Sequence, residues 1–341
     1  MCIRDRREMD RDQMAQAGAF CMRVQANGVS IEVEDSAPGD TRRPVVLLIM
    51  GLGMQLIAWS DELVGALHAA GFRVVRFDNR DAGLSQDMAE LGVRTPNVLW
   101  FGARSKLGLP AHPPYTLEDM AHDALGVLDA LGVEQAHVVG ASMGGMIAQR
   151  VALAAPHRVL SLVSMISTSG APTLPGPEPE VVRAFLRPAT RAERQGDEQA
   201  LVARAMGAFT LIGSPAYPFE HEALQASTRR AVQRSVRPQG TLRQLMAVVS
   251  DTTRFERLHE IRCPVLVLHG DADAMLPLAC GEDTARRIPG ARLVVLPGMG
   301  HMWPQSQYMQ WGAQVLAFLQ ALTDRERMPE PAVPAGSAET S

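Results

Sequence analysis

The sequence predicts an α/β fold in which a mostly parallel sheet is flanked by helices. Continuous apolar runs such as residues 44–50 and 264–269 are typical of strands that are buried on both faces of a sheet. Segments with an apolar helical stripe alternate with these runs, which indicates parallel strands joined by helices. A third observation is the pentapeptide Gly140-Ala141-Ser142-Met143-Gly144, which lies between an apolar strand and a helix. This turn predicts that the functional site lies at the end of the sheet where the strand before it ends.

The composition is that of an ordinary globular protein and argues against several classes of partner. The 341 residues are 46% hydrophobic and 21% charged, and the net charge is −4. This length and hydrophobic content are enough for one large core or two modest ones. The chain has no excess of basic residues that would indicate a nucleic-acid or membrane partner. No apolar run approaches the roughly 18 residues of a membrane span. The four cysteines show no C-x-x-C spacing. We therefore expect no metal, no cofactor and a cytoplasmic location with free thiols.

Both ends of the chain are expected to lie outside the folded domain. Residues 1–21 carry charges of both signs and lack the apolar stretch of a secretory signal, so we expect a disordered or extraneous segment. Residues 324–341 are rich in proline and alanine without a periodic apolar face, which predicts a disordered tail. The core of the domain is predicted to comprise residues 22–170 and 251–323.

The first half of this core alternates between strand and helix patterns. Asn27-Gly28 is a strong hairpin signal between two alternating segments. Residues 86–115 form a long connection, and connections of this length are usually functional or mobile. The elements that we expect are a hairpin at 22–34, a strand at 44–50, a helix at about 59–69, a strand at 72–77 and a helix that is capped by Thr116 and ends near residue 131.

The second half contains an interruption of the alternating pattern. The strand pattern breaks at Gly170, and residues 171–250 show a linker and then only helical periods, which predicts a helical cap inserted after the sixth strand. The sheet pattern then resumes. The remaining elements that we expect are strands at 136–139, 159–166, 264–269 and 292–296, and helices that begin near residue 145 and at about 279 and 305.

Ser142 is the candidate nucleophile. In a strand–G-x-S-x-G–helix setting the serine lies on a sharp turn that holds its hydroxyl out from the sheet. An ordinary tight turn has the same glycines, so the interpretation depends on whether an acid and a histidine follow in the chain. A serine hydroxyl becomes a good nucleophile only when an imidazole takes its proton and a carboxylate orients that imidazole.

An acid and a base do follow, each at the end of a strand. Asp273 and Asp271 lie just after the strand at 264–269, and His301 lies in a glycine-rich segment after the strand at 292–296. Open α/β sheets place their sites at these carboxyl ends. We take Asp273 as the acid and His301 as the base, and we expect Asp271 to brace the loop.

Two backbone N–H groups are expected to form an oxyanion hole beside Ser142. One belongs to Met143, the residue after the nucleophile, at the start of a helix. The other is expected from the loop after the strand at 44–50, at Leu52. Such a donor contributes about 10²- to 10³-fold in rate.

These residues resemble those of the α/β-hydrolase superfamily, over roughly residues 22–322. Met50-Gly51-Leu52-Gly53 stands where many relatives carry His-Gly-x-Gly, and residues 77–85 resemble a D-x-R-G-x-G-x-S turn in which Asp81 replaces a glycine. The combination looks most like the aclacinomycin methylesterase group, which implies an α/β-hydrolase fold and cleavage of carboxylic esters by Ser142, Asp273 and His301. Relatives with aspartate at the elbow, the dehalogenases and epoxide hydrolases, are disfavoured.

The flanking side chains predict an apolar substrate pocket. Methionine fills irregular apolar space, so core packing is the alternative interpretation. We expect a small-molecule ester with a hydrophobic acyl or alcohol group. A cofactor-free perhydrolase or haloperoxidase, a C–C bond hydrolase and a non-catalytic ligand-binding protein on this fold remain alternatives. The pocket residues that we expect are Met50, Met54, Trp100, Met299 and Trp303.

Overall fold

The fold is built on one eight-stranded sheet. The computed structural model describes residues 20–327 except 98–99, 103 and 105–111. The strands lie in the order β1-β2-β4-β3-β5-β6-β7-β8, and pairing is parallel except for β1 with β2 and β2 with β4. The mostly parallel sheet is thereby confirmed. The strands are β1 (Phe20–Ala26), β2 (Val29–Asp35), β3 (Val45–Ile49), β4 (Arg73–Phe77), β5 (Ala136–Ala141), β6 (Val159–Met165), β7 (Val265–Gly270) and β8 (Arg292–Leu296).

Helices cover both faces of this sheet. Alternate residues of β3 point to opposite sides, so that Leu47 packs with α4 and α5 while Leu48 packs with α2 and α13. Burial on both faces explains why the central strands read as continuous apolar runs. The covering helices are α2 (Asp61–Ala69), α4 (Leu117–Ala130), α5 (Met143–Ala154), α11 (Arg254–Arg257), α12 (Leu278–Arg287) and α13 (Tyr308–Arg327).

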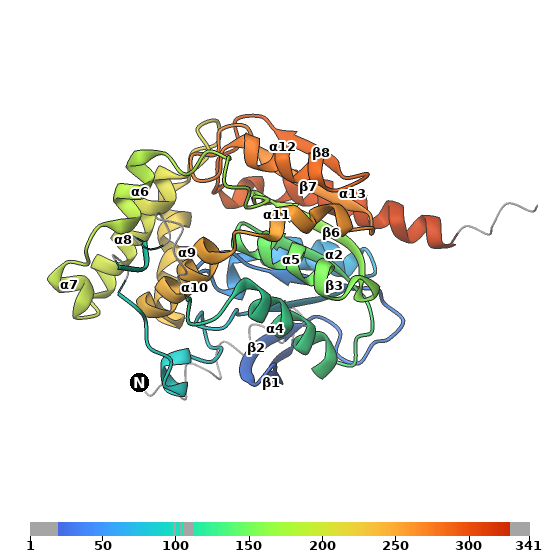
Figure 1. Cartoon of the computed structure of the whole chain (residues 1–341), viewed down its shortest axis with the longest axis horizontal. Coiled ribbons are helices and arrows are strands. Elements are labelled where there is room, and N and C mark those ends of the chain that lie inside the picture. Colours follow the sequence, from blue (N-terminus) through green and yellow to red (C-terminus); the bar gives the residue numbers. More distant parts are fainter. Residues whose placement is uncertain (1–19, 98–99, 103, 105–111, 328–341) are drawn as a thin grey trace, which may run out of the picture.

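Of the six helices between β6 and β7, the first five form an insertion, and Figure 1 shows them gathered at one side of the molecule, opposite the end of α13. The chain thus leaves the sheet after the sixth strand and returns to it about one hundred residues later. The five helices are α6 (Pro179–Leu186), α7 (Arg191–Arg194), α8 (Glu198–Leu211), α9 (His221–Arg234) and α10 (Pro238–Ser250). Short 3-10 turns complete the described structure at η1 (Leu56–Ala58), η2 (Met88–Leu91), η3 (Pro156–Arg158), η4 (Leu258–Glu260) and η5 (Gln305–Gln307).

The helix ends follow from local sequence. Thr116 accepts a hydrogen bond from the N–H of Asp119, whose side chain accepts in return from the N–H of Thr116, which is a complete capping box. Ser60 accepts from the N–H of Leu63 and so starts α2 at Asp61. The hydroxyl group of Ser142 makes no such capping bond to α5. It is therefore available for another partner.

Three predicted boundaries need correction. β1 begins at Phe20, inside the segment that was expected to be disordered, because its pairing with β2 extends to Asp35. α5 begins at Met143, directly after Ser142, rather than near residue 145. α13 runs to Arg327, past the predicted start of the tail at residue 324. Residues 1–19 and 328–341 lie outside the described residues.

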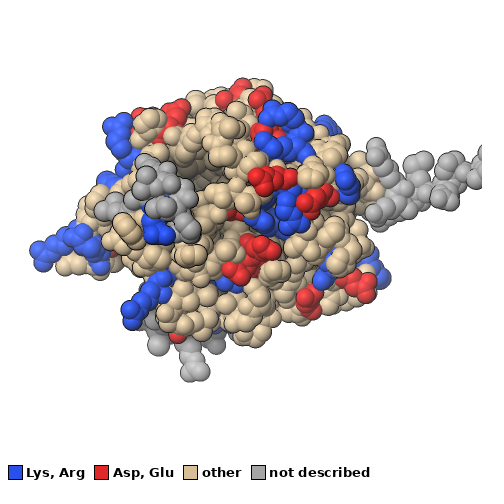
Figure 2. Space-filling model, viewed as in Figure 1, with Lys and Arg blue, Asp and Glu red and all other residues tan. Residues whose placement is uncertain are grey.

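The surface carries charges of both signs. On the face that Figure 2 shows, basic and acidic side chains are interspersed among larger neutral areas. This distribution agrees with the small net charge of −4. Within the described part of the chain, every helix is too short or too polar to cross a membrane.

Candidate active site

The turn between β5 and α5 holds Ser142 in a strained backbone conformation. Its φ is 55° and its ψ is −120°, a region that non-glycine residues rarely adopt. The flanking glycines make the turn possible, because a Cβ on Gly144 would lie 2.0 Å from the carbonyl oxygen of Ile49. A Cβ on Gly140 would lie 2.1 Å from the carbonyl oxygen of Gly144. The strand, the serine and the helix therefore pack backbone against backbone.

The structure brings Ser142, His301 and Asp273 into one hydrogen-bonded chain. His301 Nε2 lies 3.0 Å from Ser142 Oγ, and His301 Nδ1 lies 2.8 Å from Asp273 Oδ2. A carboxylate accepts, so Nδ1–H donates to Asp273 and the lone pair of Nε2 faces the serine hydroxyl. His301 and Asp273 are buried, at 6% and 5% exposure, which shields the chain from water.

Backbone groups hold the Asp273 carboxylate in place. Its Oδ1 accepts from the N–H groups of Met275 and Leu276, at 2.9 and 2.8 Å. Asp271 is turned elsewhere, since its Oδ1 accepts from the N–H of Gly298 at 2.6 Å. Of the two candidate acids, the structure places Asp273 against His301 and gives Asp271 a loop-bracing bond.

His269, at the end of β7, was expected to be a surface or packing residue and lies close to the acid. This side chain is buried, and its Nε2–H donates to the carbonyl oxygen of Leu276 at 2.7 Å, with Asp273 Oδ2 at 3.6 Å. Burial lowers the pKa of His269. The ring is therefore neutral near pH 7, and its one N–H is already donated to Leu276. The i, i+4 spacing to Asp273 was the available signal.

The loop after β3 lies against the nucleophile. A Cβ on Gly51 would come within 3.2 Å of Ser142 Cβ and 3.3 Å of the carbonyl oxygen of Ala141. Among the described residues, the N–H groups of Leu52 and Met143 have no hydrogen-bond acceptor. Met143 is the first residue of α5, where an N–H points out of the helix. Both donors can therefore serve an oxyanion.

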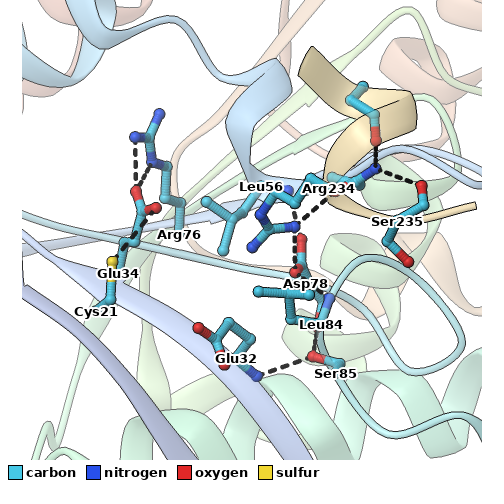
Figure 3. A network of polar contacts seen from close by, with 12 residues as sticks. Cys21, Glu32, Glu34, Leu56, Arg76, Asp78, Leu84, Ser85, Arg234 and Ser235 are labelled. Carbon is cyan, nitrogen blue, oxygen red and sulfur yellow. Dashed lines mark hydrogen bonds and ion pairs between the residues drawn. The ribbon is translucent and has the colours of Figure 1, made fainter. Parts of the chain in front are cut away.

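A turn after β4 braces this loop from the side, and Figure 3 shows its central carboxylate, that of Asp78. Asp78 is fully buried and accepts from the N–H groups of Leu56 and Leu84, at 2.7 and 2.8 Å. Arg234, at the end of α9, pairs with the same carboxylate at 2.7 Å. Asn79 donates to the carbonyl oxygen of Met50 at 2.9 Å. The turn thus joins the loop to the inserted helices.

Asp81 occupies the position where the related turn carries glycine. Its φ is 67°, a left-handed conformation that explains the glycine elsewhere. The buried carboxylate receives Arg243 of α10 at 2.7 and 2.6 Å and the hydroxyl of Tyr115 at 2.7 Å. Burial raises the pKa of Asp81, but the bonds from Arg243, the N–H of Met88 and Tyr115 outweigh it and leave that pKa below its usual value. Asp81 is therefore ionised and paired.

The predicted pocket residues do not all lie together. Met50, Met299 and Trp303 are buried in the apolar cluster on the α2 and α13 side of the sheet, and Met54 packs against that cluster. Trp100 is 65% exposed, with the guanidinium of Arg104 5.9 Å from its ring. Trp100 therefore lies outside that buried cluster. A pocket wall of methionine and tryptophan side chains stays a prediction.

The inserted helices approach the acid. A cavity of about 460 Å³ includes Asp273 and Pro277 in its wall on the side of the sheet. Leu211 and Gly213, at the end of α8, form part of the opposite wall. The insertion is therefore part of the surroundings of the hydrogen-bonded chain.

Residues 44–303 match the model of the alpha/beta hydrolase fold family. The chain belongs to the α/β-hydrolase family. This α/β-hydrolase is similar to the rhodomycin D methylesterase DauP of Streptomyces sp. (strain C5), with 30% identity over 301 residues that cover 84% of the chain and 94% of the relative. The predicted resemblance to the methylesterase group and the predicted fold are confirmed.

Two further likenesses concern a second curated relative and the fold. The α/β-hydrolase is 27% identical over 304 residues to a 2-hydroxy-6-oxononadienedioate/2-hydroxy-6-oxononatrienedioate hydrolase of Burkholderia vietnamiensis (strain G4 / LMG 22486), over 87% of the chain and 93% of the relative. A crystal structure of the enol-lactonase from Burkholderia xenovorans LB400 superposes with a TM-score of 0.63 and 22% identity, over 89% of the chain and 100% of that protein. The protein is thus a hydrolase, and its methylesterase relatives support ester hydrolysis.

Replacing Gly144 by alanine tests the close packing of the turn. The added Cβ would lie 2.0 Å from the backbone oxygen of Ile49, so the turn must move. We expect Gly144→Ala to lower kcat/KM for an activated ester about 10²-fold, because a misplacement of about 1 Å costs that much. Gly65→Ala in α2 is the control, since nothing lies within 4 Å of its added Cβ. Full activity of Gly144→Ala would contradict the strained turn.

Proposed function

We propose that the protein is a serine carboxylic ester hydrolase that acts through Ser142, His301 and Asp273. The observation that carries the proposal is the continuous hydrogen-bonded chain, with 3.0 Å between His301 Nε2 and Ser142 Oγ and 2.8 Å between His301 Nδ1 and Asp273 Oδ2. The methylesterase relatives support the same class of reaction.

Acylation begins with the serine hydroxyl. As Ser142 Oγ attacks the ester carbonyl carbon, His301 Nε2 takes the hydroxyl proton, and Asp273 stabilises the imidazolium that forms. The carbonyl oxygen becomes an oxyanion that accepts from the N–H groups of Leu52 and Met143. When the tetrahedral intermediate collapses, His301 returns the proton to the leaving alkoxide. An acyl-serine and a free alcohol result.

Deacylation repeats these steps with water. His301 Nε2 takes a proton from a water molecule whose oxygen attacks the acyl carbon, and the same two N–H groups hold the second oxyanion. Collapse breaks the bond to Ser142 Oγ, which recovers its proton from His301. The products are a carboxylic acid and the starting enzyme, and no metal or organic cofactor enters the balance.

The substrate that we propose is a small to medium hydrophobic ester. Met50, Met54, Met299 and Trp303 present soft apolar side chains on the elements that flank the site. We propose further that residues 171–250 act as a cap, with residues 22–170 and 251–323 as the core. The cavity beside Asp273, which α8 helps to enclose, supports that role. A cytoplasmic location stays a prediction.

A C–C bond hydrolase is the second candidate. The Burkholderia vietnamiensis relative is named for 2-hydroxy-6-oxo dienedioates, and a serine triad can serve such a cleavage. Turnover of 2-hydroxy-6-oxononadienedioate with a kcat/KM above that for every ester tested would favour this candidate over the esterase.

Replacing Ser142 by alanine removes the proposed nucleophile. We expect kcat for p-nitrophenyl esters to fall about 10⁶-fold, since the members of a triad act as a unit. Mass spectrometry should show one fluorophosphonate adduct at Ser142 of the unchanged protein and none in Ser142→Ala. Ser227→Ala, an exposed serine of α9, is the control. Turnover at the original rate by a folded Ser142→Ala enzyme would contradict the proposal.

The two candidate acids can be separated by a matched pair of variants. Asp273→Asn should lower kcat about 10⁴-fold, because an amide no longer stabilises the imidazolium form of His301. Asp271→Asn keeps an oxygen that can accept from the N–H of Gly298, so its kcat should stay close to that of the unchanged enzyme. The assignment fails if the two variants lose activity equally or in the reverse order.

A series of p-nitrophenyl esters tests the apolar pocket. Burial of each added methylene contributes up to about 0.8 kcal/mol, so kcat/KM should rise about tenfold or more from acetate to hexanoate. Met54→Gln should reduce this ratio by making the pocket wall polar. Equal kcat/KM for acetate and hexanoate would show that no apolar pocket holds the acyl chain.

A further inference from the structure

Helix α10 packs closely against the loop that is proposed to carry an oxyanion donor. Gly53 has a φ of +65°, and a Cβ there would lie 2.8 Å from Thr241 Oγ1 in α10. One residue earlier in the helix, a Cβ on Gly240 would lie 2.3 Å from the carbonyl oxygen of Asp81. The helix therefore sits against both the loop after β3 and the turn after β4.

Gln244 joins these two segments from the same helix. Its side chain is fully buried; Oε1 accepts from the N–H of Gly53 at 2.8 Å, and Nε2 donates to the carbonyl oxygen of Arg80 at 2.7 Å. Gly53 directly follows Leu52, so the bonded peptide group shares the Leu52 Cα with the peptide group that carries the proposed donor. Only the φ and ψ angles of Leu52 separate the two planar groups, so holding one of them restricts the directions open to the other.

Other bonds hold the loop on both sides of this point. The carbonyl oxygen of Met50 accepts from Asn79 at 2.9 Å. Gln55 accepts from Arg234 at 2.7 Å and donates to the carbonyl oxygens at the end of α9, among them that of Ser235 at 3.0 Å. Gln244 is thus the brace that lies next to the proposed donor, while its neighbours fix the ends of the loop.

The seating of α10 itself does not depend on Gln244. Arg243 is buried and grips the Asp81 carboxylate through two nitrogens, at 2.7 and 2.6 Å, and it also pairs with Asp87 at 2.8 Å. Bidentate arginine–carboxylate pairs give strong geometric control. A change at Gln244 can therefore alter the loop while the helix stays docked.

We propose that Gln244 is a positioning residue, which holds the peptide after Leu52 so that the N–H of Leu52 points at the developing oxyanion. The proposal rests on the ester hydrolase function and its oxyanion hole. It makes the seating of the inserted helices a condition for catalysis, since the brace reaches the loop from α10. A residue of the insertion then acts on the rate of the chemical step, whereas pocket residues act on binding.

The test replaces Gln244 by methionine, which keeps the volume and removes both hydrogen bonds. We expect kcat to fall roughly 10- to 100-fold and KM to change by no more than about twofold, because a misplaced donor weakens interactions that are made only in the transition state. The inhibition constant of a trifluoromethyl ketone, which forms a tetrahedral oxyanion on serine, should rise in step with the loss of kcat/KM. Gln239→Met, at an exposed position of α10, is the control.

Gln244→Glu provides a second arm if the methionine variant fails to fold. A protonated carboxyl can still accept from Gly53 and donate to the Arg80 carbonyl, whereas a carboxylate cannot donate. The activity of Gln244→Glu relative to the unchanged enzyme should therefore fall as the pH rises. A pH-independent ratio, or a Gln244→Met enzyme with unchanged kcat and trifluoromethyl ketone affinity, would overturn the inference. If the unchanged protein forms no fluorophosphonate adduct at Ser142, the ester hydrolase function fails first.

Discussion

The close approach of backbone to backbone at the turn between β5 and α5 is the constraint on which the rest of the site depends. Gly144 lies against the carbonyl oxygen of Ile49, and Ser142 takes a φ of 55° between strand and helix. Because the turn is this tight, the serine hydroxyl stands clear of the helix that it starts and lies 3.0 Å from His301. The same contact brings the end of β3, and the loop that follows it, beside the serine. Strain is tolerated here because packing on both sides leaves the turn no alternative.

The inserted helices are attached to this site through buried charge and amide groups. Arg243 pairs with Asp81, Arg234 pairs with Asp78, and Gln244 bonds the loop after β3. Burying such charges costs desolvation energy that an apolar contact would not. These buried contacts define the geometry of the site, since each charged pair is compatible with only a few relative orientations of its side chains. The helices and the loop are therefore coupled in position.

Much of the site could be predicted because its parts follow strands. Ser142, Asp273 and His301 each lie just beyond the carboxyl end of a strand, and a parallel sheet gathers such ends at one edge. The sequence pattern alone does not separate Asp273 from Asp271, because both residues follow β7 and the direction of each side chain depends on the loop. The orientation of Trp100 could not be predicted, because an aromatic residue in a long connection belongs to no periodic pattern that indicates which way it faces. It is 65% exposed.

Local patterns were enough for the alternation of strand and helix, the helix cap at Thr116 and the glycines around Ser142, because each depends on neighbours within a few residues. Contacts between distant segments had no such signal. Gln244 lies 191 positions from Gly53, and nothing near either residue in the chain indicates that the two meet. Folding brings them together because α10 packs on two loops that β3 and β4 hold side by side. The candidate catalytic residues can thus be identified from short segments of sequence. The geometry that orients them arises from how those segments pack.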